Sequence, residues 1–146
     1  MKAVIQVVSQ AELKVDGQVV SSIGKGLVVF FCVERDDEES KLPYFAKKVA
    51  NLRIFEDENG KTNLSVKDVG GEVLFVSQFT LAGDCEKGNR PSFSGAELPE
   101  RAEKMYLQCA EMIKNVENVP IKLGVFGGDM KITQTNDGPF TVIVEK

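Results

Sequence analysis

Residues 72–81 constrain the fold of this chain more than any other segment. The segment begins with a continuous apolar run at residues 73–76, which is typical of a strand that is buried on both faces of a sheet. It then changes abruptly to Ser77, Gln78 and Thr80, with apolar residues between them. A buried strand that ends in hydroxyl and amide groups can hold a functional site on a rigid support. Taken alone, the segment favours an ordinary core strand whose polar groups bond to neighbouring backbone.

Composition indicates an ordinary globular protein. The chain has 146 residues, 42% of them hydrophobic and 27% charged, so we expect one soluble domain spanning residues 1–146. No apolar run approaches the ~20 residues of a membrane span and no signal-peptide cleavage pattern follows the N-terminus, so we expect a cytoplasmic location and no membrane partner. The net charge of −4 argues against non-specific coating of nucleic acid, but leaves room for a basic patch that contacts one end of an RNA.

The absence of histidine excludes several kinds of site. Without it there is no Ser-His-Asp or Cys-His catalysis, no His-ligated metal and no imidazole acid or base. The three cysteines, Cys32, Cys85 and Cys109, are far apart and odd in number, which favours neither a disulfide framework nor a zinc site. We expect Cys32 and Cys109 in the core, leaving Cys85 as the candidate reactive thiol, and we expect no metal and no cofactor.

Hydrophobic periodicity predicts many short strands and two helices. Strands are expected at residues 3–8, 11–20, 27–33, 53–55, 73–76, 120–125, 130–135 and 140–145, with a hairpin turn at Asp16-Gly17 within the second. One helix is expected to end near residue 52, with Pro43 in its first turn. A second helix is expected to span about residues 99–115. The predicted fold class is α+β, a compact, barrel-like, largely antiparallel sheet with two amphipathic helices.

Two segments stand out as candidate sites. Nucleophile-elbow, phosphate-loop and dinucleotide-binding motifs are absent from the sequence. The aperiodic loop at residues 82–98 is long enough to be functional. The first candidate is Ser-Gln-Phe-Thr-Leu at residues 77–81. The second is Asn-Asp-Gly-Pro-Phe-Thr at residues 136–141, which by itself predicts only a turn.

Together and in this order, the two segments resemble the signature motifs of the D-aminoacyl-tRNA deacylases, also called the D-tyrosyl-tRNA deacylase family. The resemblance covers nearly the whole chain. It includes the opening Ala-Val-Ile-Gln and residues 51–55, 60–63, 87–93 and 124–127.

The resemblance implies a homodimeric enzyme that hydrolyses the ester between a D-amino acid, or glycine, and the 3′-adenosine of tRNA. Ser77 to Thr80 would line the pocket for the aminoacyl-adenosine. Gly138-Pro139, joined by a cis peptide bond, would project from one subunit into the pocket of the other.

Chemical reasoning adds roles to these residues. An aminoacyl ester is already activated, so attack by water needs chiefly a stabilised oxyanion and fixed geometry. The backbone N–H groups of Phe79 and Thr80, with Gln78 beside them, are the candidate catalytic groups, and the ribose 2′-hydroxyl can help to activate water. The carbonyls of Gly138 and Pro139 would hold the amino group and exclude an L side chain, while glycine is admitted. A nucleophilic Thr80 is less favoured because no histidine can activate it.

Two alternatives remain at this point. One is a catalytically silent RNA-end-binding module of the same fold, and the other is a thiol hydrolase that uses Cys85. The intact signatures favour the deacylase. The chain departs from the family at Val7, where an arginine thought to help fix the Gly-Pro element is typical, and at Cys32, where glycine is usual. We therefore expect the Gly-Pro element to be held differently or more loosely.

Overall fold

The computed structural model describes all residues from Met1 to Lys146. Strands predominate, with two α-helices and two short 3₁₀ helices, η1 and η2. In chain order the elements are β1 (Lys2–Val15), β2 (Gln18–Ile23), β3 (Gly26–Cys32), η1 (Glu39–Lys41), α1 (Leu42–Asn51), β4 (Phe55–Glu56), β5 (Thr62–Leu64), β6 (Glu72–Ser77), η2 (Phe79–Ala82), α2 (Pro99–Asn115), β7 (Ile121–Leu123) and β8 (Met130–Glu145). No helix is both long and apolar enough to cross a membrane.

The main sheet has six strands in the order β2-β1-β3-β6-β7, with β8 paired to β1. Strand β1 is antiparallel to β2, β3 and β8, as expected. The β3–β6 and β6–β7 pairs are parallel, which the sequence analysis did not predict. Parallel pairing follows from the connections, because α1 lies between β3 and β6 along the chain and α2 between β6 and β7, and a helical crossover returns the chain to the same end of the sheet.

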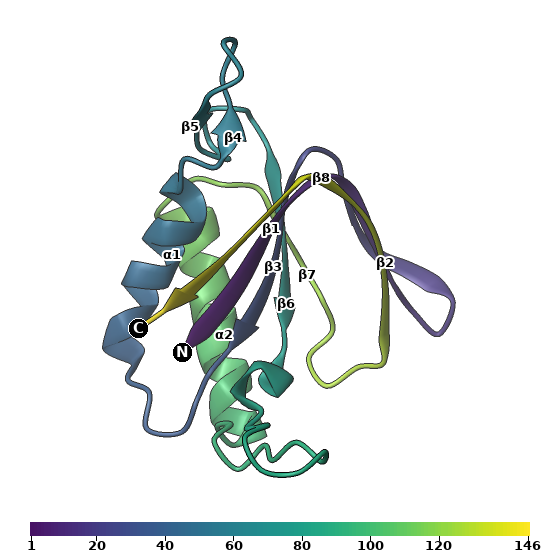
Figure 1. Cartoon of the computed structure of the whole chain (residues 1–146), viewed down its shortest axis with the longest axis vertical. Coiled ribbons are helices and arrows are strands. Elements are labelled where there is room, and N and C mark those ends of the chain that lie inside the picture. Colours follow the sequence, from purple (N-terminus) through teal and green to yellow (C-terminus); the bar gives the residue numbers. More distant parts are fainter.

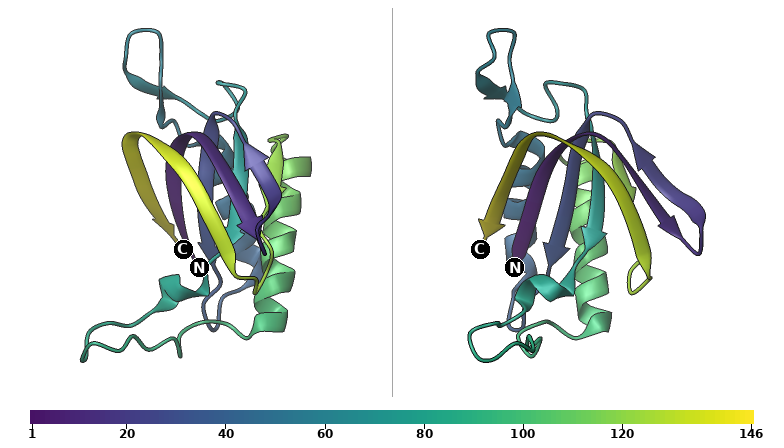
Figure 2. Two further views of the ribbon diagram at one scale, coloured as in Figure 1. Left: turned by 90° about the vertical axis from the view of Figure 1, so that its right-hand side faces the viewer. Right: turned by 45° about the vertical axis from the view of Figure 1, so that its right-hand side comes forward.

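Strand β6 is buried on both faces, as its apolar run predicts. Val73 and Phe75 lie in the larger core with residues of both helices. Leu74 and Val76 lie in a smaller core with residues of β1, β2 and β3. Both helices cover one face of the sheet, while the bent ends of β1, β2 and β8 curl over the other, which gives the barrel-like shape (Figures 1 and 2). The α+β, barrel-like expectation is therefore confirmed.

Local turn signals are also confirmed. Asp16 and Gly17 both have positive φ, +50° and +76°, as a two-residue hairpin turn between β1 and β2 requires. Pro43 lies in the first turn of α1, where its missing N–H leaves no helical hydrogen bond unmade.

The turn predicted at residues 136–139 is wrong. Strand β8 is one element that pairs with β1 on both sides of this segment, with Val8 opposite Asn136 and Gln6 opposite Thr141. Residues 137–140 therefore form a bulge that faces only Val7. The continuous β1 supplies ladder partners before and after the bulge, so the chain resumes the same strand. Register breaks of this kind bend strands, and β1 and β8 bend together at the top of Figure 1.

Candidate active site

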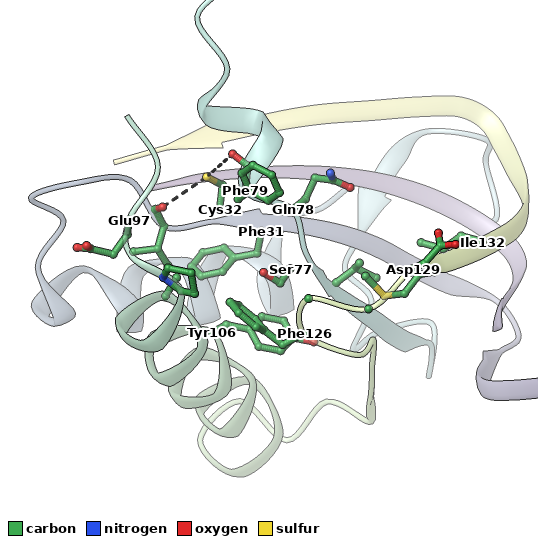
Figure 3. Close-up of a pocket in the computed structure, with 17 residues that line it drawn as sticks. Phe31, Cys32, Ser77, Gln78, Phe79, Glu97, Tyr106, Phe126, Asp129 and Ile132 are labelled. Carbon is green, nitrogen blue, oxygen red and sulfur yellow. Dashed lines mark hydrogen bonds between the residues drawn. The ribbon is translucent and has the colours of Figure 1, made fainter. Parts of the chain in front are cut away.

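A cavity of about 510 Å³ opens at the carboxyl ends of β3 and β6 (Figure 3). Its walls come from these strand ends, the segment leading into α2 and its first turns, and the segment from β7 into β8. The lining residues are Phe31, Cys32, Val33, Val76, Ser77, Gln78, Phe79, Glu97, Pro99, Ala102, Tyr106, Phe126, Gly127, Gly128, Asp129, Met130 and Ile132. Three of the predicted site residues, Ser77, Gln78 and Phe79, thus meet in one cavity.

Three aromatic side chains pack together at this cavity. The ring of Tyr106 stacks on Phe75 with centroids 5.1 Å apart and planes 5° apart, and Phe126 lies 6.2 Å from Tyr106 on the cavity side. The Tyr106 hydroxyl donates to the Phe75 carbonyl at 2.7 Å. Strand β6 is thereby fixed to α2 just before it delivers Ser77 to the cavity. Tyr106 lies in the helix predicted at residues 99–115 and Phe126 in the stretch 124–127, and neither was selected as a site residue from the sequence.

Helix η2 begins where β6 ends. The Gln78 N–H donates to the Phe31 carbonyl at 2.8 Å, and the Leu81 N–H closes the turn onto Gln78 at 3.2 Å. Between them, the N–H groups of Phe79 and Thr80 have no acceptor within the turn, because the first donors of any helix lack one, and no side chain caps them. These are the two backbone donors that the sequence analysis selected.

The Thr80 side chain does not line the cavity. Its hydroxyl oxygen accepts a hydrogen bond from the Gln78 Nε2 at 2.5 Å. Gln78 therefore links the end of β6 to η2, and no carboxylate, amine or imidazole contacts the Thr80 hydroxyl as a base. This arrangement favours a role for the Thr80 backbone over a nucleophilic role for its side chain.

Glu97 and Asp129 are the carboxylates of the cavity lining. Glu97 accepts from the Leu98 N–H at 2.8 Å and pairs with Arg101. The Leu98 hydrogen bond, assisted by Arg101, holds the pKa of Glu97 below its ordinary value despite the opposing effect of desolvation. A carboxylate with a lowered pKa and occupied oxygens is a weak general base. Asp129 pairs with Lys131 at the surface.

The cysteine of the cavity is Cys32, whereas Cys85 is exposed and lies outside it. Cys32 and Cys109 are buried, as predicted. The sequence did not indicate that Cys32 lines the cavity or that its Sγ lies 3.6 Å from the Phe79 carbonyl. Burial raises the pKa of Cys32 to about 11 and that of Cys109 to about 12, so both remain neutral thiols near neutral pH.

We expect Cys85 to be dispensable for hydrolysis. A small alkylating reagent at neutral pH should modify Cys85 and spare the two buried, protonated thiols, because thiolates react and neutral buried thiols do not. Mass spectrometry of the modified peptides, measured beside the rate of ester hydrolysis, tests this. Activity that falls in proportion to Cys85 modification, or a loss in Cys85→Ser, would revive the thiol-hydrolase hypothesis.

The second predicted motif lies outside this cavity. Gly138 and Pro139 are exposed on the β8 bulge, and neither lines the cavity of its own chain. The peptide bond between them is cis, as the resemblance implies. The Gly138-Pro139 element therefore lies at the surface of the chain. The structure of one chain thus brings Ser77, Gln78 and Phe79 together and leaves the Gly-Pro element apart from them.

Comparison with known proteins identifies the family. The model of the family described as D-Tyr-tRNA(Tyr) deacylase matches residues 4–145. The chain belongs to the D-Tyr-tRNA(Tyr) deacylase family. A relative from Thermodesulfovibrio yellowstonii, named D-aminoacyl-tRNA deacylase, is 49% identical over 99% of this chain and 98% of its own. A second relative of that name, from Magnetococcus marinus, is 54% identical over 97% of this chain and 94% of its own.

Solved structures share the fold of this chain. The chain is similar to a protein described as c-Myc DNA Unwinding Element Binding Protein, with a TM-score of 0.93 and 40% identity over 100% of this chain and 99% of that one. A probable eukaryotic D-amino acid tRNA deacylase shares the fold, with a TM-score of 0.84 at 17% identity over 98% and 97% of the two chains. The expectation of an enzyme of the deacylase family is confirmed.

Proposed function

We propose that this protein hydrolyses the ester between a D-amino acid, or glycine, and the 3′-adenosine of tRNA, releasing free amino acid and tRNA. Residues 1–146 would act as one deacylase domain in the cytoplasm, paired with a second copy. The observation that carries the proposal is the division of the two signatures: Ser77 and its neighbours line a cavity, while Gly138-Pro139 lies exposed outside it.

A composite site between two copies accounts for this division. A two-fold dimer presents the same surface from each subunit, so a bulge that enters the partner's cavity is matched by the partner's bulge entering the first. Each cavity would then combine Ser77, Gln78 and Phe79 of one subunit with Gly138 and Pro139 of the other.

The chemistry at η2 follows from its free donors. As water attacks the ester carbonyl, negative charge develops on its oxygen, and the N–H groups of Phe79 and Thr80 are oriented donors for that charge. The 2′-hydroxyl of the terminal ribose is adjacent to the ester and assists the attacking water. This route requires no histidine and no protein nucleophile.

Chirality is read by exclusion at the Gly-Pro element. The carbonyls of Gly138 and Pro139 accept from the substrate ammonium group, which fixes the α-carbon. The bulge backbone then occupies the space in which an L side chain would lie, whereas a D side chain points away and glycine has none.

Parallel hydrolysis assays test the proposed function. Release of free amino acid is measured from D-Tyr-tRNA, L-Tyr-tRNA and Gly-tRNA with the same enzyme preparation. We expect rapid turnover of the D-ester, turnover of the glycyl ester and little of the L-ester. Binding of tRNA without turnover of any ester would favour the silent RNA-end-binding module, and equal turnover of the L-ester would contradict the exclusion mechanism.

A further inference from the structure

The β8 bulge departs from the ladder that holds the rest of the strand. Its residues, 137–140, lie between the β1 partners Gln6 and Val8 and face only Val7. The Val7 side chain is 4% exposed and packs in the larger core, and its methyl groups cannot donate a hydrogen bond. Gly138 has a φ of +118°, which other residues rarely adopt. Glycine also has the greatest backbone freedom of all residue types, so it does not hold the bulge in place by itself. The bulge therefore needs support from another source.

Gln6 bonds to both sides of this bulge. Its Nε2 donates to the Thr141 hydroxyl at 3.3 Å, immediately after the bulge. Its Oε1 accepts from the Gln134 Nε2 at 2.9 Å. The Gln134 Nε2 also donates to the Oδ1 of Asn136, the residue immediately before the bulge, at 2.5 Å. A carboxamide has both a donor and an acceptor, so one Gln6 side chain joins the two ends.

We propose that Gln6 is a positioning residue that sets the Gly138-Pro139 bulge and thereby the discrimination between D- and L-aminoacyl esters, an inference that rests on the proposed function. Exclusion of an L side chain requires a wall that does not yield. A displacement of about 1 Å in a group that positions the substrate can cost about a hundredfold in rate. Release of the bulge from Gln6 both weakens the grip on the D-substrate and opens space for the L-substrate.

Substitutions that keep volume but remove the hydrogen bonds separate this role from packing. Gln6→Met removes the carboxamide, and Thr141→Val removes the hydroxyl that accepts from it. Thr141→Ser retains the hydroxyl. Thr135→Val is the matched control, because Thr135 is an exposed β8 threonine that pairs with Gln10 and lies outside this network.

The readout is the ratio of kcat/KM for D-Tyr-tRNA to that for L-Tyr-tRNA, with thermal unfolding recorded in parallel. We expect Gln6→Met and Thr141→Val to lower this ratio by about tenfold, and Thr141→Ser and Thr135→Val to stay within about twofold of the wild type. An unchanged ratio in Thr141→Val, or an equal fall in Thr135→Val, overturns the inference. If Gln6→Met does not fold, the comparison of Thr141→Val with Thr141→Ser tests the inference.

A second measurement does not depend on turnover. Backbone ¹⁵N order parameters at Gly138 and Phe140 should fall in Gln6→Met and Thr141→Val, because the bulge becomes more mobile, while the order parameter at Gly60, in the β4–β5 turn, should not change. Unchanged order parameters at the bulge overturn the positioning role. A wild-type enzyme that hydrolyses none of the esters overturns the proposed function instead, so the two failures are distinguishable.

Discussion

Replacing Gly138 by alanine is expected to lower kcat/KM for D-Tyr-tRNA by about a hundredfold or more while the protein remains folded. Gly138 has a φ of +118°, a region that L side chains rarely adopt. An added Cβ would also lie 2.8 Å from the backbone nitrogen of Phe140, which must then shift. Because Gly138 is exposed on the bulge, the strain displaces the bulge without opening the core.

Gly60→Ala is the matched control for this prediction. Gly60 also has positive φ, +70°, but nothing lies within 4 Å of an added Cβ, and it is in the turn between β4 and β5. Both variants should lose about 1–3 kcal/mol of stability through backbone strain. Only Gly138→Ala should lose activity, as measured by steady-state deacylation beside urea unfolding. Equal activities for the two variants would show that the bulge takes no part in catalysis.

Mixing two inactive variants is expected to restore activity if each site combines residues of two subunits. Ala102 is 9% exposed and lines the cavity, so Ala102→Phe fills space that the substrate needs. The Gly-Pro bulge of the Ala102→Phe chain stays intact. Gly138→Ala has the converse defect, with an open cavity and a displaced bulge. In a heterodimer, the cavity of the Gly138→Ala chain receives the intact bulge of the other.

The expected recovery is quantitative. After subunit exchange of equal amounts, half the dimers are mixed and each has one complete site of two, so activity should reach about a quarter of the wild-type value. The measurement is deacylation of D-Tyr-tRNA before and after exchange, with each variant exchanged against itself as the control. A bulge that served its own chain's cavity would give no recovery.

Local sequence determined much of the fold. The unbroken run at residues 73–76 predicts a strand buried on both faces, because neither face can be left to water, and the two cores on either side of β6 confirm it. The Asp16-Gly17 turn and the first turn of α1 were likewise predictable, because the φ restrictions of glycine and proline act within a few residues.

The candidate site was predictable only in part. Ser77, Gln78 and Phe79 were selected from the motif and meet in the cavity. Tyr106 and Cys32 fitted core patterns equally well, since a residue that lines a buried cavity has the same polarity as one that packs against a neighbour.

Sequence by itself determined which segments are buried, the hairpin turn at Asp16-Gly17 and which two motifs stand out. Only the tertiary structure decided that residues 136–141 form a bulge rather than a turn, and that Gln6 bonds to both of its sides. Burial and turns follow from interactions between near neighbours in the chain. The bulge and its support join residues more than a hundred positions apart, and such pairing depends on the register of β1 with β8, which no local pattern specifies.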